Sequence, residues 1–302
     1  MSKPFDLTRR TILTGAVAAA AGGALGLVAG CSGRSGDSAN ETADAGASSL
    51  DTVLSRRSLR AGYSGFRPYT IASAASPSQP TGFIVDVLVE IGRRIDPAVA
   101  VAWSPVTFEA LSADMSSGRI DVFADAVYYT IPRAQRFIFT DPVGYFGVGA
   151  AVVRSSDNRF RTVMDLDRPG VVIALAQGWT ATDFAQRVFR HARLDIVPVG
   201  DDGSVPLQNV LAGRADAALQ DVPTVAQFVA ANAGQVKAID LDTPPARVAA
   251  GFLLPRASVA LRDFLNVSIE VLRADGTLRR LSQRWQLYNS FERREFADEP
   301  GL

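Results

Sequence analysis

Two successive series of short apolar strands and helices run along the chain, and this alternation limits the folds open to it. The predicted strands cover residues 58–63, 99–103, 120–124, 171–175, 195–199, 215–220 and 249–255. The predicted helices cover residues 50–57, 83–95, 108–117, 180–190, 205–212, 223–231, 258–274 and 277–285. Alternating strands and helices favour mostly parallel sheets with helices on both faces. We therefore expect an α/β protein with two mostly parallel-sheet lobes.

The helix over residues 83–95 shows the pattern most clearly. Ile84, Val87, Leu88 and Ile91 recur at helical spacing and form one apolar stripe. Such a stripe must be buried against a sheet, so this helix should cover one face of the first lobe.

Composition excludes several classes of protein. The 302 residues are 47% hydrophobic, enough for a core, and 31 cations balance 31 anions, so binding of nucleic acid by bulk charge is not expected. One Cys and one His leave no disulfide framework, Cys/His zinc site or zinc-protease motif within the chain. A Ser-His-Asp triad would have to use His191, which lies in a polar stretch and should be exposed to solvent. No cofactor is expected.

The first 30 residues read as an export signal. Arg9 and Arg10 precede an uncharged run over residues 12–30, which resembles a twin-arginine signal, and LVAGC at residues 27–31 resembles a bacterial lipobox. Cys31 would then carry the lipid, and residues 31–57 would form a flexible tether. The alternative is a buried thiol within a membrane anchor. The expected location is the outer face of the cytoplasmic membrane.

Seven segments in the remaining chain resemble, in order, motifs of the family 3 extracellular solute-binding proteins, the polar-amino-acid receptors of ABC importers. The segments are SLRAGYSGFRPY (58–69), TGFIVD (81–86), FEAL with SGRID (108–121), TIPR with FIFTDP (130–142), QGWT (177–180), GRADAALQD (213–221) and LRADGTL with a Trp (272–285).

This resemblance implies a bilobed type II periplasmic binding protein fold with a two-strand hinge. Lobe 1 would comprise residues 58–148 and 251–290, lobe 2 residues 155–246, and residues 291–302 would form a tail. The ligand would sit in the cleft between the lobes. A monomeric, lipid-anchored receptor that delivers an amino acid or similar solute to an ABC permease and its ATPase is the expected function.

The resemblance also implies how the two charged groups of an amino acid are held. Arg133 corresponds to the arginine that binds the ligand carboxylate, and a planar guanidinium suits that group. Thr180 corresponds to a second carboxylate contact at a helix start, and Asp221 to the acid that accepts the ammonium. Each has a structural alternative: a surface arginine for Arg133, and helix caps for Thr180 and Asp221.

Further predicted contacts surround these three. Phe66 and Phe108 correspond to aromatic walls, although each could be a core residue, and Ala126 and Tyr128 to backbone amide contacts. Gln220, beside Asp221, is included in the same set. Tyr128 replaces a small hydroxyl residue of the family.

Two positions in this region bear on the identity of the ligand. Tyr63 stands where many relatives carry an Asp. Asp125 follows an apolar strand and should face the cleft at the strand end, with Tyr63 donating a hydrogen bond to it. A second acid would favour a polar or basic ligand side chain. A structural Asp that caps the turn before Thr130, and an amine shared by both acids, are the alternatives.

Two other classes of function use this fold. Some family members resemble cyclohexadienyl dehydratases, which need a general acid in the cleft, a role open to Asp125 or Glu109. A sensory or wall-degrading protein would need a further membrane span or catalytic domain, and we expect neither. Hence no catalytic or metal-binding residue is predicted.

Overall fold

A continuous mixed β-sheet runs through the computed structural model, which describes residues 49–95, 99–198 and 203–287. The strand order is β2-β1-β3-β10-β5-β8-β6-β7, with β4 paired to β10 and β9 to β5. The strands are β1 (Ser58–Tyr63), β2 (Ala100–Pro105), β3 (Val122–Tyr128), β4 (Ile138–Phe139), β5 (Gly144–Arg154), β6 (Val172–Ala176), β7 (Arg193–Val197), β8 (Ala217–Asp221), β9 (Val236–Ile239) and β10 (Ala246–Leu254).

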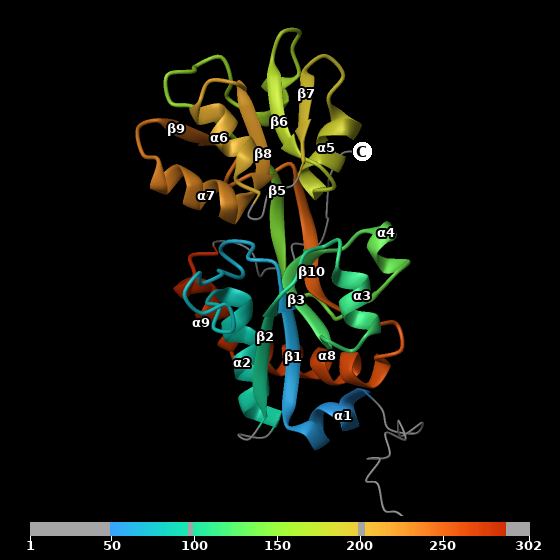
Figure 1. The fold of residues 1–302 in the computed structure, drawn as a ribbon. Helices are drawn as coiled ribbons and strands as arrows, with labels where there is room; N and C mark the ends of the chain where they lie inside the picture. The colour runs from blue at the N-terminus through green and yellow to red at the C-terminus, as the bar shows by residue number, and fades with distance from the viewer. Residues whose placement is uncertain (1–48, 96–98, 199–202, 288–302) are drawn as a thin grey trace, which may run out of the picture. The chain divides into compact units, whose positions relative to one another are not determined.

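Two long strands, β5 and β10, join two groups of elements (Figure 1). Residues 144–148 of β5 pair antiparallel with residues 246–250 of β10, and the rest of each strand pairs within one group. We call β1–β4 with their helices lobe 1, and β6–β9 with theirs lobe 2. The bilobed α/β fold is thus confirmed, but the two parallel three-stranded parts, β2-β1-β3 and β8-β6-β7, are fused into one mixed sheet by the crossing strands.

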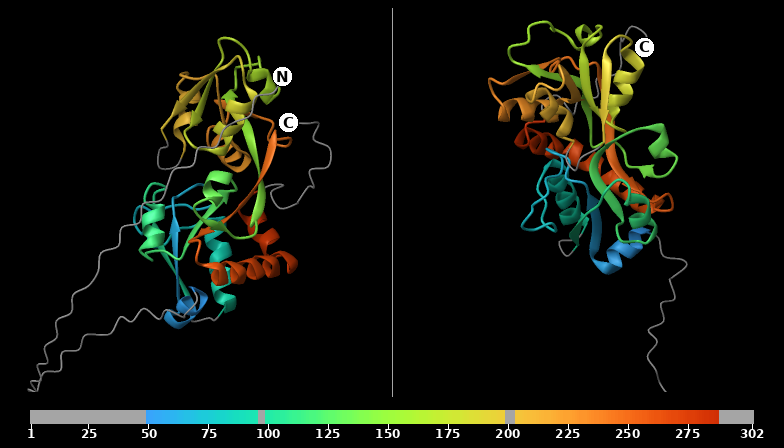
Figure 2. Two further views of the ribbon diagram at one scale, coloured as in Figure 1. Left: turned by 90° about the vertical axis from the view of Figure 1, so that its right-hand side faces the viewer. Right: turned by 45° about the horizontal axis from the view of Figure 1, so that its top comes forward.

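Helices cover both faces of the sheet, as Figure 2 shows from two further directions. Those of lobe 1 are α1 (Ser49–Arg56), α2 (Phe83–Ile95), α3 (Leu111–Ser116), α4 (Ile131–Ala134), α8 (Val259–Ala274) and α9 (Thr277–Arg284). Those of lobe 2 are the short η1 (Val163–Leu166), α5 (Thr180–Val188), α6 (Val205–Leu211) and α7 (Val222–Ala231). The apolar stripe of α2, including Ile84 and Leu88, is fully buried.

One boundary differs from its prediction in a way that matters for the site. Strand β3 continues to Tyr128, whereas the apolar run ends at Ala124. Pairing with β10 extends it, because Tyr128 lies opposite Ala250. Asp125 therefore lies inside a buried strand and not at its end, which corrects the prediction. The charged side chain of Asp125 interrupts the apolar pattern in the sequence. It does not end the strand, because neighbouring strands still pair with the backbone on either side of it.

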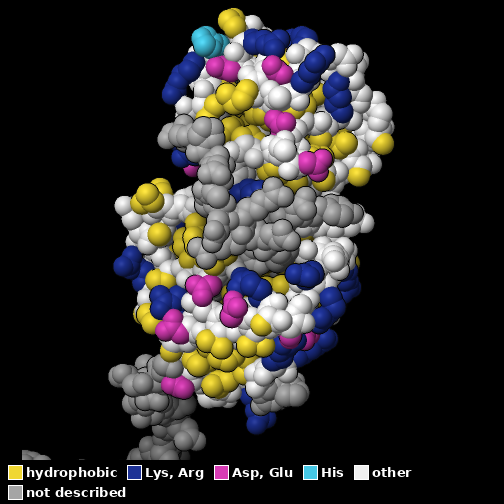
Figure 3. Space-filling model, turned by 180° about the vertical axis from the view of Figure 1, so that it is seen from behind, with side chains coloured by type: hydrophobic (Ala, Val, Ile, Leu, Met, Phe, Trp, Pro, Cys, Tyr) yellow, Lys and Arg dark blue, Asp and Glu magenta, His cyan; other side chains and the backbone are white. Residues whose placement is uncertain are grey.

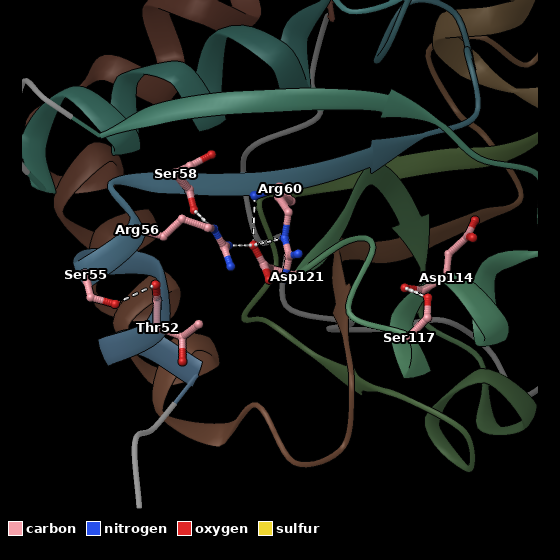
Figure 4. A network of polar contacts seen from close by, with 8 residues as sticks. All are labelled: Thr52, Ser55, Arg56, Ser58, Arg60, Asp114, Ser117 and Asp121. Atoms are coloured by element: carbon pink, nitrogen blue, oxygen red, sulfur yellow. Dashed lines mark hydrogen bonds and ion pairs between the residues drawn. The ribbon is translucent and has the colours of Figure 1, made fainter. Parts of the chain in front are cut away.

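A cluster of polar side chains fastens α1 to lobe 1 (Figure 4). The Asp121 carboxylate lies at the start of β3 and accepts hydrogen bonds from the Arg60 backbone nitrogen and guanidinium, each at 2.8 Å. Arg56, the last residue of α1, bonds the same carboxylate. Residues 49–56 are thus a docked helix, as predicted for residues 50–57, and do not belong to a flexible tether. The predicted signal, Cys31 and the tail over residues 291–302 lie outside the described residues.

The segment between β1 and α2 folds back on itself, so that the backbone at Gly82 lies close to the backbone at Tyr69. Gly82 has φ +138°, and a Cβ there would lie 2.3 Å from the Tyr69 carbonyl oxygen. The Thr81 and Ile71 backbones pair beside it. This approach fixes the position of Tyr69, whose side chain is fully buried.

The first prediction concerns this approach. Gly82→Ala should lower the free energy of unfolding by at least about 2 kcal/mol more than Gly170→Ala, because backbone must shift to admit the methyl group. Gly170 is a matched control, since it also has positive φ (+84°) but open space around it. Urea unfolding of both variants measures the difference, and equal losses would contradict the assignment of a close approach at Gly82.

Candidate functional site

A cavity of about 360 Å³ lies between the lobes and contains the predicted site residues in its wall. The ten predicted binding residues that line it are Tyr63, Phe66, Phe108, Asp125, Ala126, Tyr128, Arg133, Thr180, Gln220 and Asp221. The first seven come from lobe 1 and the last three from lobe 2. A concave, largely apolar cavity with a few polar groups is typical of a small-molecule site.

Arg133 enters the cavity wall from the short helix α4. Thr130 caps that helix, since its hydroxyl accepts from the Arg133 backbone nitrogen at 3.4 Å. The guanidinium donates to the Tyr128 carbonyl oxygen at 2.9 Å and lies 5.5 Å from the centre of the Phe108 ring. Burial lowers the pKa of Arg133, and Asp183 and Tyr128 partly oppose this. Within the described ranges no carboxylate lies at ion-pair distance from Arg133, so Asp183 acts on this partly buried cation only from farther away.

Thr180 is the first residue of α5, on the opposite lobe. Its hydroxyl oxygen is buried and has no hydrogen-bond partner in the described part of the chain. The residue in the N-cap position is Trp179, so Thr180 does not act as the cap. An unpartnered buried hydroxyl is costly, and at a helix N-terminus it adds to backbone N–H groups that favour an anion.

Asp221 ends β8 and caps α7 at the same time. Its carboxylate accepts hydrogen bonds from the Thr224 nitrogen at 3.1 Å and the Thr224 hydroxyl at 2.9 Å. The Tyr69 hydroxyl lies 3.3 Å from Oδ1. Burial raises the pKa of Asp221 to about 6, against the opposing effect of these hydrogen bonds. The capping alternative is therefore correct, yet the same carboxylate also lines the cavity.

Asp125 is buried and held by the loop that follows β1. It accepts from the Ser64 nitrogen at 2.8 Å, from the Ser64 hydroxyl at 2.6 Å and from the Thr70 hydroxyl. Burial raises the pKa of Asp125, and these bonds oppose the rise. The predicted donor, Tyr63, instead bonds the Pro77 carbonyl oxygen at 2.7 Å, which corrects that expectation. Asp125 fastens residues 64–70 to β3 and does not cap the turn before Thr130.

Aromatic rings form much of the cavity wall. Phe66 of lobe 1 meets Trp179 of lobe 2 edge to face, with ring centres 5.1 Å apart. Phe108 is 45% exposed and packs against Phe123, so it is a wall residue and not a core residue. Trp179 was missed by the sequence prediction, although it directly precedes Thr180. Its place in the QGWT motif, where a loop meets a helix, could have indicated a role in the site.

The remaining predicted residues are held by neighbours. The Gln220 side chain donates to the Gly203 carbonyl oxygen at 3.2 Å, and Gly203 lies against the Trp179 ring. The Tyr128 hydroxyl lies 3.3 Å from the Tyr69 hydroxyl, and burial raises the pKa of both phenols well above the usual value. Tyr69, which was not predicted, thus lies behind the cavity wall and contacts both lobes.

No group of three or more His, Cys, Asp or Glu side chains in the part of the chain that the structure describes could hold a metal ion. None of the helices in this part is both long and apolar enough to cross a membrane. His191 is exposed, as predicted, and its Nδ1 lies 3.1 Å from Asp167. On the face shown in Figure 3, side chains of both charge signs occur over both lobes.

This fold and cavity define a bilobed α/β binding protein with a small-molecule site between its lobes. The sequence profile of the bacterial extracellular solute-binding proteins, family 3, matches residues 59–288. The chain belongs to this family, as its motifs predicted.

Comparison with individual proteins agrees with this assignment. The chain is 27% identical over 244 residues to a Haemophilus influenzae protein named "Probable amino-acid ABC transporter-binding protein", covering 79% of this chain and 88% of that one. It is 23% identical to cyclohexadienyl dehydratase of Pseudomonas aeruginosa, covering 80% and 87%. A solved structure of a lysine-bound ABC transporter component from Wolinella succinogenes has TM-score 0.67 at 24% identity, covering 76% and 96%. That likeness shows the fold.

The second prediction uses the buried carboxyl of Asp221. Its pKa is about 6 in the folded protein and 3.8 in the unfolded chain, so the folded state binds the proton more tightly. The protonated carboxyl therefore adds to the free energy of unfolding below about pH 4, and this stabilisation is lost as the pH rises through 6. Between pH 4 and pH 7, wild type should therefore lose up to about 3 kcal/mol of stability relative to Asp221→Asn, which can still cap α7. Urea unfolding at both pH values gives the difference, and a pH-independent difference would contradict burial of the charge.

Proposed function

We propose that the cavity binds an amino acid or an amino-acid-like solute, with the carboxylate held by Arg133 and Thr180 and the ammonium by Asp221. One observation carries this proposal: a guanidinium without a carboxylate partner and a carboxylate without a cationic partner line the same cavity. The ion pairs of the described residues include neither Arg133 nor Asp221. A zwitterion between them would satisfy both.

Closing the cavity around a ligand removes water from the charged groups in its wall. A buried charge is costly unless it is paired and hydrogen-bonded. Arg133 gives one hydrogen bond to the Tyr128 carbonyl oxygen and keeps further N–H groups for a carboxylate. The buried Thr180 hydroxyl supplies another donor from lobe 2. A ligand carboxylate would therefore join the two lobes, which is how binding would stabilise the closed arrangement.

The same reasoning gives the protein a role as an extracytoplasmic receptor. Closure around the solute would be the signal that an ABC permease reads, and its ATPase would supply the energy. The names of two relatives support this, since both are given as amino-acid ABC transporter-binding proteins. A lipid on Cys31 would keep the receptor, expected to be a monomer, on the outer face of the cytoplasmic membrane. Mass spectrometry of the exported protein tests the lipid.

Asp125 is less available to a ligand side chain than the sequence suggested. Ser64 and Thr70 take three of its acceptor positions. About one of the roughly four positions of a carboxylate is left for a cationic group on the ligand. The adjoining stretch of the cavity wall comprises Pro105, Val106, Thr107, Phe108 and the acidic Glu109. A thermal-shift screen with arginine, lysine, glutamine, leucine and phenylalanine compares basic, polar and apolar side chains directly.

We also infer that the protein is a receptor and not an enzyme. Of the two candidate general acids, Asp125 accepts three hydrogen bonds within the protein and is not presented as a free acid. Glu109 lines the cavity from an exposed position, so an activity assay tests its role directly. The relative named cyclohexadienyl dehydratase shows that the family includes an enzyme. Release of phenylpyruvate from a cyclohexadienyl substrate would contradict our inference.

The third prediction is that Arg133→Ala abolishes most amino-acid binding, with a loss of about 3–5 kcal/mol, because the ligand carboxylate would be buried without its partner. Arg136→Ala is a matched control, since Arg136 is exposed in the turn after α4 and does not line the cavity. Isothermal titration calorimetry measures affinity, and circular dichroism checks the fold. Unchanged affinity in Arg133→Ala would overturn the proposed binding mode.

The fourth prediction separates the two ends of the ligand. Asp221→Asn should lower the affinity for an amino acid tenfold to a thousandfold, because the ligand ammonium loses its counter-charge. The affinity for the corresponding acid without the amino group should change little. Calorimetric titration of both ligands into both proteins completes the comparison. A similar loss for both ligands would assign Asp221 to capping alone.

A further inference from the structure

Tyr69 is the buried residue through which the two lobes share a polar contact at the candidate site. It belongs to the segment between β1 and α2, and its side chain is fully buried. The hydroxyl lies 3.3 Å from Asp221 Oδ1 in lobe 2 and 3.3 Å from the Tyr128 hydroxyl in lobe 1. Tyr69 does not line the cavity, but both of its partners do.

The direction of these two hydrogen bonds follows because each phenol has only one hydroxyl hydrogen to donate. An ionised carboxylate only accepts, so the Tyr69 hydroxyl donates its single hydrogen to Asp221. The Tyr128 hydroxyl must then donate to Tyr69. The result is a relay, Tyr128 to Tyr69 to Asp221, in which both phenolic hydrogens are used within the protein. The Tyr128 oxygen can still accept from a ligand, but it has no hydrogen left to give.

The segment that carries Tyr69 is held firmly on its own lobe. Asp125 binds it through Ser64 and Thr70 on either side of Phe66 and Tyr69. The Tyr69 ring packs edge to face on Phe146 of the crossing strand β5, with ring centres 4.8 Å apart. Its hydroxyl is therefore presented to Asp221 from a fixed direction, while Thr224 holds the same carboxylate from within lobe 2.

We propose that Tyr69 is a positioning residue for Asp221: its hydroxyl holds the ionised carboxylate at the cavity wall when the lobes are together. The inference rests on the proposed function, in which Asp221 accepts the ligand ammonium. It assigns a role to a residue that touches no ligand. It also gives the Tyr128 phenol a role, as the donor to the Tyr69 oxygen.

Binding of an ammonium at Asp221 should depend on pH. The polar groups that face Asp221 are Tyr69 from the β1–α2 segment, Tyr128 from β3 and Thr224 from α7, and Arg133 acts on Tyr128 from α4. Asp221 must be ionised to accept an ammonium, so affinity should fall as the pH drops through its pKa. A donor to the carboxylate favours the ionised form. Tyr69→Phe should therefore move this acid limb to higher pH.

The test compares Tyr69→Phe with Tyr129→Phe. Tyr129 also loses a hydroxyl that is bonded within lobe 1, to the Thr140 carbonyl oxygen, but it does not line the cavity. Calorimetric dissociation constants between pH 4.5 and pH 8 should show the acid limb about one unit higher in Tyr69→Phe, and several-fold weaker binding at pH 6 to 7. Tyr129→Phe should keep the wild-type midpoint. An unchanged midpoint in Tyr69→Phe would overturn the inference, because a purely structural role lowers stability without moving the pH profile.

A second readout needs no ligand. Carboxyl-carbon NMR of protein labelled at Asp follows the titration of Asp221, with Asp221→Asn identifying its signal. If no amino acid binds the wild type, the proposed function fails, and this titration decides the inference by itself. A higher midpoint in Tyr69→Phe than in wild type supports the hydrogen bond. Identical midpoints show that the hydroxyl does not reach Asp221.

Discussion

The antiparallel pairing of β5 with β10 is the constraint on which the rest of the described structure depends. These two strands carry the chain between the lobes and pair with each other over residues 144–148 and 246–250. Because the backbone hydrogen bonds of this ladder are shared, the lobes are parts of one sheet. Each lobe then adds its parallel strands to one end of the pair, and the loops that follow those strands meet at the cavity.

Buried charge is distributed unevenly between structural and candidate functional roles. Asp125 is satisfied within lobe 1, and Asp121 by two arginines at its surface. Arg133 and Asp221 make no ion pair among the described residues, although each is hydrogen-bonded. An incomplete pair of this kind is expected where a ligand completes the electrostatics. The presence or absence of an ion-pair partner within the protein thus separates charged residues that hold the structure, such as Asp121, from those proposed to bind a ligand, such as Asp221.

Most of the fold could be predicted from the sequence, and β1 and α2 match their predicted bounds, because the apolar period and flanking turns determine such elements locally. The family motifs also identified side chains that meet at one cavity. Asp125 shows the limit of this reasoning. Its strand continues only because β10 pairs beside it, and its partners Ser64 and Thr70 are about sixty residues away. Trp179 and Tyr69 were missed for the same reason, since their roles come from contacts across the lobes.

The Phe66–Trp179 contact gives the molecule an intrinsic optical probe. The sequence has three tryptophans. Trp103 is buried in lobe 1, and Trp285 donates its ring N–H to Asp86 at 2.8 Å, also in lobe 1. Trp179 alone belongs to lobe 2, lines the cavity and touches a ring of the opposite lobe. Separation of the lobes would expose this indole to water and leave the other two in place, so a change in tryptophan emission would report the movement without an added label.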